Sequence, residues 1–218
     1  MGIGEMGNKF LHMLFGVFIL SGMSQAQALT INFSDISSDL TDPSLLSATM
    51  VLEVTNTGGN DLLNMTITNL SNDFKLAEAF INFTGDNSLL TLDTVPAGFS
   101  STLSFDTTAD GFGTFDIMLD LDSMNNGLAI NQSETWIIDL GVTGVTTEDF
   151  NLLSGPPGNK QQLAALKFTQ GPCDPEVVGA CVEDSAYGGG SVVPVPAAVW
   201  LFGSGLLGLV GVARRKHA

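Results

Sequence analysis

Short runs in which apolar and polar residues alternate constrain this chain more than any other feature. The clearest is the run 116–122, where every second residue is apolar and aspartates fill three of the positions between. Ile117, Leu119 and Leu121 share one face of an extended chain, and Asp116, Asp120 and Asp122 share the other. This period of two predicts a half-buried β-strand with an acidic, solvated face.

Similar runs recur along the chain between clusters of Gly, Asn, Asp and Ser. A turn cluster at 57–61 separates the first pair of runs and predicts a hairpin. The predicted strands are 48–55, 62–70, 77–84, 88–95, 100–105, 112–122, 134–140 and 164–169. Thr147 is predicted to cap a short turn of helix at 147–150. Many short strands without alternating helices predict an all-β fold, an antiparallel β-sandwich.

The amino-acid composition favours a packed sheet, and its net charge limits the partners that the protein can bind. Fourteen phenylalanines against one tyrosine favour an aromatic core over a sugar-binding surface, and Trp136 lies within a predicted strand. Between Leu29 and Val193 the chain has three lysines and 22 acidic residues, a net charge of −19. Such a surface repels nucleic acid and anionic lipid, so we expect neither as a partner.

The N-terminal segment has the features of a signal peptide. Lys9 precedes an apolar run from Phe10 to Met23, and Ala26 and Ala28 then form a small-x-small cleavage site. The run is short for a bilayer span, which needs about 20 apolar residues. The alternative is a buried helix that stays in the fold. We expect removal of residues 1–28 by signal peptidase and a mature chain that starts at Leu29.

The C-terminal segment has three parts in a fixed order. Val193, Pro194, Val195 and Pro196 come first, and the prolines stop any structure that arrives from upstream. An uncharged stretch of 17 residues follows, from Ala197 to Ala213, about 26 Å long as a helix and just enough to span a bilayer. Arg214, Arg215 and Lys216 end the span. These cations favour the cytoplasmic side, which leaves the domain outside the cytoplasm.

This order of proline motif, short span and basic end resembles the PEP-CTERM sorting signal in a Val-Pro-x-Pro-Ala form. The resemblance covers 193–216 and implies recognition by exosortase, a membrane-embedded processing enzyme. It also implies removal of the tail and delivery of the domain to the cell surface or the polysaccharide matrix. Val195 stands where the family usually has Glu, which leaves the exosortase subtype open. The alternative is a permanent anchor, for which 17 apolar residues are few.

The sequence thus predicts four parts: a signal peptide (1–28), a sandwich (29–172), a cysteine loop with a Gly-rich linker (173–192) and a sorting signal (193–218). Cys173 and Cys181 are the only cysteines. An exported chain with one pair of cysteines in a short, turn-rich segment is expected to form a disulfide between them. The run 188–191, Gly-Gly-Gly-Ser, predicts a flexible linker.

Several kinds of chemistry are excluded by residue type. Both histidines and both arginines lie in the terminal segments, so the domain cannot form a Ser-His-Asp site or an imidazole-bound metal site. Paired carboxylates could hydrolyse a glycosidic bond. Asp106 and Asp110 flank a turn that offers oxygens to Ca²⁺, although the order of an EF-hand is missing. The competing interpretation is an acidic hairpin loop.

These observations favour a non-enzymatic, secreted protein of the surface or biofilm matrix, without a cofactor, sorted by exosortase. Its partners would be signal peptidase and exosortase during processing, the inner membrane transiently, and exopolysaccharide. The second hypothesis is a glycan-binding module that needs Ca²⁺. The third is a carboxylate glycosidase.

Overall fold

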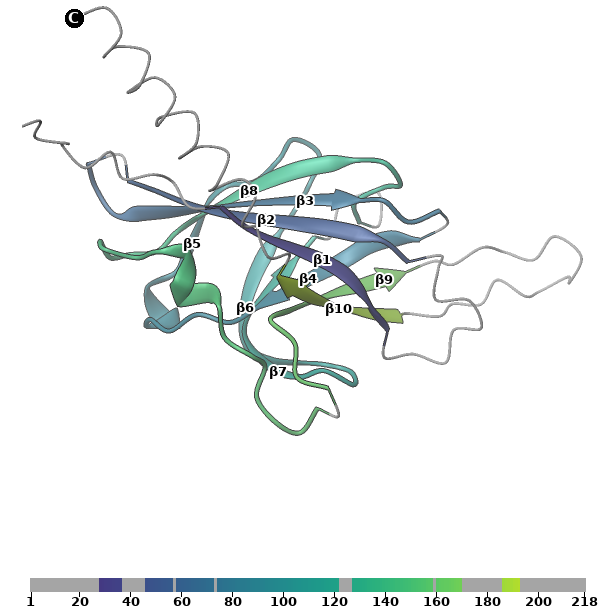
Figure 1. The fold of residues 1–218 in the computed structure, drawn as a ribbon. Coiled ribbons are helices and arrows are strands. Elements are labelled where there is room, and N and C mark those ends of the chain that lie inside the picture. Colours follow the sequence, from purple (N-terminus) through teal and green to yellow (C-terminus); the bar gives the residue numbers. More distant parts are fainter. Residues whose placement is uncertain are drawn as a thin grey trace, which may run out of the picture.

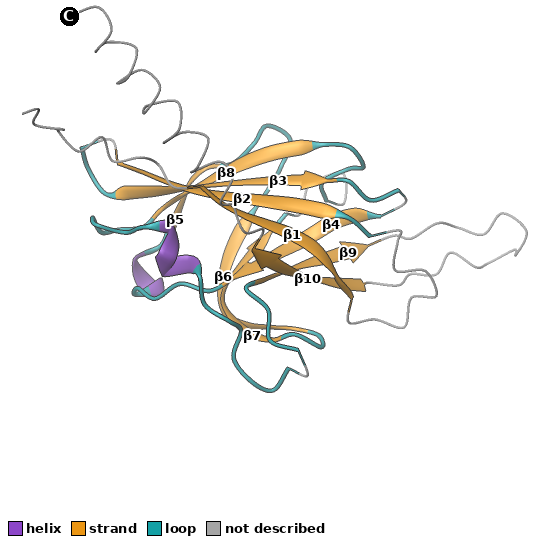
Figure 2. Cartoon of the chain, in the orientation of Figure 1, coloured by secondary structure: helices purple, strands orange, loops and turns teal. Residues whose placement is uncertain are grey.

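The computed structural model describes residues 28–36, 46–56, 58–72, 74–121, 127–158, 160–169 and 186–192. In this part of the chain the regular structure is almost entirely β, with two short 3₁₀ helices beside β5 (Figures 1 and 2). The strands are β1 (Ala28–Ile36), β2 (Ala48–Asn56), β3 (Asp61–Asn69), β4 (Lys75–Ile81), β5 (Thr91–Thr94), β6 (Thr102–Ala109), β7 (Gly113–Asp120), β8 (Ser133–Asp139), β9 (Ala164–Thr169) and β10 (Ala186–Val192). The 3₁₀ helices are η2 (Asn87–Leu89) and η3 (Thr147–Phe150).

All ten strands belong to one antiparallel sheet, which confirms the all-β prediction. Their order across the sheet is β5-β8-β3-β2-β1-β10-β9-β4-β7-β6. The sheet curls until its edge strands, β5 and β6, approach within 8 Å between Cα atoms. The result is a nearly closed, barrel-like sheet. A sandwich has two separately hydrogen-bonded sheets, whereas here hydrogen bonds link every strand to the next.

The predicted hairpin at 48–70 is present with an unbroken register. β2 and β3 pair from Ala48 with Asn69 to Asn56 with Asp61. Every second residue of β3 is buried, as the alternation predicts. The same holds for β7, where Ile117 and Leu119 are fully buried, whereas Met118 between them and Asp116 and Asp120 on either side are half-buried. The period of two therefore identified both strands and their inward faces correctly.

The interior of the curled sheet is one apolar core of aliphatic and aromatic side chains. It includes Phe33, Phe74, Phe83, Phe150 and Phe168, which supports the prediction of a phenylalanine-rich core. Trp136 is also fully buried. Its Nε1 donates a hydrogen bond of 2.9 Å to Ser101 Oγ, and its ring meets Phe99 edge-on at 5.3 Å. The segment between β5 and β6 thus packs against the core at the point where the sheet nearly closes.

A second, smaller apolar cluster includes Phe80 and Ala165, which lie on the face of the sheet opposite the main core. Its buried members are Phe80, Ala109, Phe112, Phe115 and Ala165, with Met118 and Tyr187 packed at the margin. Ala165 belongs to this cluster, while its neighbours Ala164 and Leu166 belong to the main core. Alternation along β9 therefore places the Ala165 side chain on the face opposite the main core. The end of the β6–β7 hairpin covers this outer cluster with Phe112.

The prediction of a flexible linker at 188–191 was wrong. These residues belong to β10, an inner strand with β1 on one side and β9 on the other. A Cβ on Gly190 would lie 2.4 Å from Ile31 Cγ2 and 2.8 Å from Phe33 Cε1, and one on Gly189 would lie 2.8 Å from Phe112 Cε1. Glycine is present because the neighbouring side chains leave no room for a larger residue. The sheet consequently extends to Val192, beyond the predicted domain boundary at 172.

The helical turn at 147–150 is present, but Thr147 is not its cap. Thr146 holds that position, and Thr147 is buried inside the turn. The Asp149 carboxylate accepts hydrogen bonds from Thr146 N at 2.8 Å and Thr146 Oγ1 at 3.1 Å. It also accepts one from Thr84 Oγ1 at 2.8 Å, which ties the turn to the loop that follows β4. These bonds, first that of Thr146 N and then that of Thr84, lower the pKa of Asp149.

Candidate functional site

A shallow pocket lies between the β6–β7 hairpin and the loop 155–158. Its volume is about 170 Å³, and Thr108, Ala109, Asp110, Gly111, Gly113, Pro157 and Gly158 line it. Gly155 holds the loop against β7 through a pair of backbone hydrogen bonds with Thr114, at 2.8 and 3.0 Å. Gly113 has a φ of +96°, and a Cβ there would lie 2.0 Å from Gly155 O. Close backbone contact therefore shapes this pocket.

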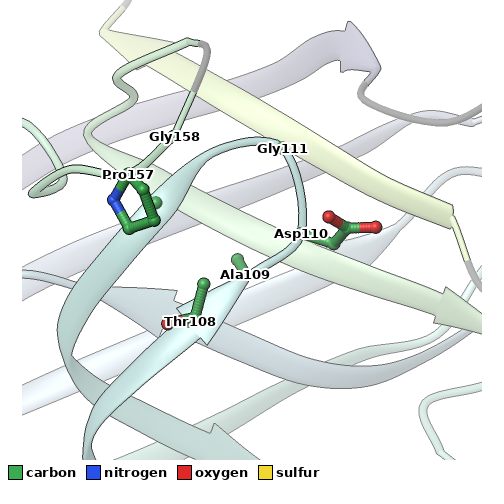
Figure 3. Close-up of a pocket in the computed structure, with 7 residues that line it drawn as sticks. Thr108, Ala109, Asp110, Gly111, Pro157 and Gly158 are labelled. Atoms are coloured by element: carbon green, nitrogen blue, oxygen red, sulfur yellow. The ribbon is translucent and has the colours of Figure 1, made fainter.

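The pocket brings little reactive chemistry together. Asp110 is its one ionisable lining residue, and Figure 3 shows the Asp110 carboxylate turned away from the Pro157 ring. Asp106 and Asp110, the predicted Ca²⁺ candidates, are both exposed. Asp106 lies in β6 with a left-handed φ of 53°, and Asp110 directly follows that strand. Among the described residues, no group of three or more His, Cys, Asp or Glu side chains is placed to hold a metal ion.

A row of polar side chains crosses the outer face of four neighbouring strands. Tyr187 of β10 pairs with Lys167 of β9, Lys167 with Glu78 of β4, and Glu78 with Asp120 of β7. Lys167 Nζ lies 2.6 Å from Glu78 Oε1. It also lies 6.0 Å from the centroid of the Tyr187 ring, so a cation covers that ring. These four side chains form a polar row across β10, β9, β4 and β7, with an ion pair between Lys167 and Glu78 at its centre.

The ionisation of this row follows from partial burial and from its charges. Burial pulls the pKa of Lys167 down, but the hydrogen bond and the charge of Glu78 outweigh it, and the net pKa is raised. Burial also raises the pKa of Tyr187, and the nearby carboxylates of Glu78 and Asp110 add to that rise against the opposing charge of Lys167. Both groups therefore keep their protons at neutral pH. A protonated tyrosine and a charged lysine provide no general base.

The two ends of the described sheet form the arrangement that bears most on function. β1 begins at Ala28, the predicted signal-cleavage residue, and β10 ends at Val192, one residue before the proline motif. These are neighbouring strands, and Ile31 pairs with Val192. The chain therefore enters and leaves the sheet side by side, at the same end of β1 and β10. Figure 1 shows both strands in the middle of the sheet.

Most of the other predicted site residues lie outside the described residues. These are Ala26, the cysteines Cys173 and Cys181, the motif residues Val193, Pro194, Val195, Pro196 and Ala197, and the cations Arg214, Arg215 and Lys216. The predicted disulfide and the predicted span at 197–213 thus remain predictions. Within the described ranges, no helix is long and apolar enough to cross a membrane.

Sequence reasoning missed the polar row and the adjacency of the two ends. Lys167 and Glu78 are 89 residues apart in the chain, so no local spacing could pair them. One signal was available, because Lys167 is the only cation inside a predicted strand. No known protein family, curated protein or solved structure matches this chain.

Proposed function

We propose that this chain is an exported, non-enzymatic protein of the cell surface or extracellular polysaccharide matrix, delivered by its C-terminal tail as a sorting signal. In this proposal signal peptidase removes residues 1–28, and exosortase removes the tail after the domain has left the cytoplasm. The tail resembles the PEP-CTERM signal in its proline motif, its short apolar stretch and its basic end.

One observation carries the proposal: both expected processing points lie at the limits of the same sheet. Cleavage after Ala28 would remove a single ladder pair, that of Ala28 with Glu53, and leave the pairs from Leu29 onward. Cleavage beyond Val192 would remove none of the described ladder pairs. A protein processed at both ends needs a fold that survives both cuts, and this sheet meets that requirement.

The proline motif begins directly after β10, where prolines are well placed to end the strand. β10 lies between two strands, so a continuation of β10 would need backbone N–H groups for the ladder. Pro194 and Pro196 have no N–H and cannot donate such bonds. The chain is therefore expected to leave the sheet as an extended segment directly after Val192. An extended peptide is the form in which a protease can bind and cut its substrate.

The strongly negative net charge of the domain supports a location outside the cytoplasm and the absence of a nucleic-acid partner. Residues 29–192 contain three lysines, 22 acidic residues, no histidine and no arginine. A net charge this far from zero favours solubility and limits self-association. The same composition leaves out the nucleophile–histidine pairs and arginine clamps on which many enzymes depend.

Replacing Pro194 and Pro196 by alanine tests this proposal. A sorting signal read by a processing enzyme should fail, and uncut protein should accumulate in the inner membrane. A permanent anchor should be indifferent, because both prolines precede the apolar stretch. Pro96→Ala, in the turn after β5, is the matched control, since it alters a proline away from the tail. Normal tail removal in the double variant would refute the proposal.

A further inference from the structure

The distance between the sheet and the apolar stretch is short, because residues 186–192 form β10 and not a linker. From Val192 to Ala197 there are five residue steps, about 16 Å in the extended form that prolines favour. The headgroup layer takes up about 5–7 Å of that distance, judged from the total and hydrocarbon thickness of a bilayer. With the tail embedded, roughly 10 Å separates Val192 from the outer limit of the headgroups.

The β2–β3 hairpin reaches further than this in the same direction. Val192 pairs with Ile31, and Ile31 pairs with Met50 of β2. β2 then continues for six residues to Asn56, about 20 Å at the usual rise of a strand. A tilt of about 40°, common in curled sheets, reduces that projection to about 15 Å. The hairpin tip therefore projects about 15 Å past Val192, which is more than the roughly 10 Å between Val192 and the outer limit of the headgroups.

The exposed part of the hairpin tip has no charge, although the domain as a whole is strongly acidic. Asn56, Gly58, Gly59 and Asn60 are exposed and uncharged. The one carboxylate at the tip, that of Asp61, is only 3% exposed. It accepts hydrogen bonds from Asn56 Nδ2 at 2.5 Å and from Val145 N at 2.8 Å. Its charge thus points into the protein and not toward a membrane.

The neighbouring turn extends this uncharged surface. Asp61 N donates to Val142 O at 2.8 Å, which holds the turn 140–146 against the hairpin. That turn contains no ionisable side chain, and Val142 is 37% exposed. These two adjoining loops therefore offer amide, hydroxyl and apolar groups and no exposed carboxylate of their own. Amide and hydroxyl groups can hydrogen-bond to phosphate and ester oxygens, which a carboxylate cannot do.

We propose that the β2–β3 hairpin tip and the turn 140–146 contact the phospholipid headgroups of the bilayer that holds the tail before it is removed. This inference rests on the proposed function, since it needs the tail to lie in the membrane. The surface sets the orientation of the uncut domain, with this end toward the bilayer and the loop at 127–132 away from it. Exosortase would then meet the proline motif beside the hairpin.

Site-specific quenching in the full-length chain tests the orientation. Cys173 and Cys181 are changed to Ser, and a single cysteine is placed at Gly59, Ile130 or Leu206 and labelled with a fluorophore. Gly59 has no heavy atom within 4 Å of an added Cβ, and Ile130 is exposed near the far end of β3. The labelled chains are reconstituted in phosphatidylethanolamine–phosphatidylglycerol nanodiscs that carry a nitroxide on the headgroups or in the acyl chains.

The expected result is loss of fluorescence at Gly59 with the headgroup nitroxide, none at Ile130, and loss at Leu206 with the acyl-chain nitroxide. Equal quenching at Gly59 and Ile130, or stronger quenching at Ile130, overturns the inference while the tail remains inserted. Absence of quenching at Leu206 overturns the proposed role of the tail, and the inference fails with it. The three labels thus separate failure of the orientation from failure of the proposed function.

Discussion

Replacing Gly190 by alanine tests whether β10 is a packed inner strand. An added Cβ would lie 2.4 Å from Ile31 Cγ2 and 2.8 Å from Phe33 Cε1, inside the main core. Ile31 and Phe33 have stiff side chains on the adjacent strand β1, so the two backbones must separate or these side chains must leave their rotamers. Overpacking of this kind costs about 1–3 kcal/mol. With an m-value of about 2 kcal/mol/M, the urea midpoint should fall by roughly 0.5–1.5 M.

Urea unfolding of the purified protein, followed by far-UV circular dichroism, measures this change. Gly59→Ala is the matched control, because its Cβ would meet no heavy atom within 4 Å. That substitution should be neutral or stabilise by about 0.4–1 kcal/mol through the unfolded state. If the two variants shift the midpoint alike, Gly190 is not packed against Ile31 and Phe33, and the account of β10 fails.

Two further predictions concern ionisable groups in the fold. Lys167→Met removes the ion pair with Glu78, whose side chains are 25% and 23% exposed, and should cost about 0.5–1 kcal/mol at pH 7. Because the pKa of Lys167 is raised above 10.5, this difference from wild type should persist up to that pH and shrink as pH rises further; a difference unchanged at higher pH contradicts it. Asp149→Ala should cost about 1 kcal/mol, because the carboxylate that completes the capping box with Thr146 is lost. Since the pKa of Asp149 is lowered below 3.8, its contribution should be present above that pH and vanish in stronger acid, as urea midpoints across pH would report.

Local alternation was enough to predict the strands whose two faces differ in polarity. In β3 and β7 each buried position alternates with a half-buried one, so the period of two is visible in the sequence. The Asn-Gly-rich turn at 57–61 then fixed the register of the hairpin. Trp136 could be assigned to the core because it lies in such a strand.

Two features could not be predicted, because they depend on distant segments. β10 reads Ala-Tyr-Gly-Gly-Gly-Ser-Val, which has the composition of a linker, yet its glycines are required by Ile31, Phe33 and Phe112 on other elements. The curling of ten strands into one sheet likewise depends on the approach of β5 and β6, which no local pattern encodes. The predicted sandwich and the nearly closed sheet have the same alternation along each strand. The choice between them lies in the pairing order.

The candidate site could be predicted only where its residues are consecutive in the sequence. The proline motif and the basic end of the tail are contiguous, so both could be identified from the sequence. The placement of Ala28 and Val192 at the same end of the neighbouring strands β1 and β10 is a consequence of topology and required the structure. The polar row of Tyr187, Lys167 and Glu78 required it for the same reason.

Mass spectrometry of the protein recovered from the cell surface or the surrounding matrix tests the central claim most directly. The account predicts an N-terminal peptide that begins at Leu29 and no peptide that contains residues 200–216. It also predicts that every strand from Leu29 to Val192 is retained in the recovered chain. Surface-exposed protein that still carries Trp200 to Lys216 would contradict the claim that the tail is a sorting signal.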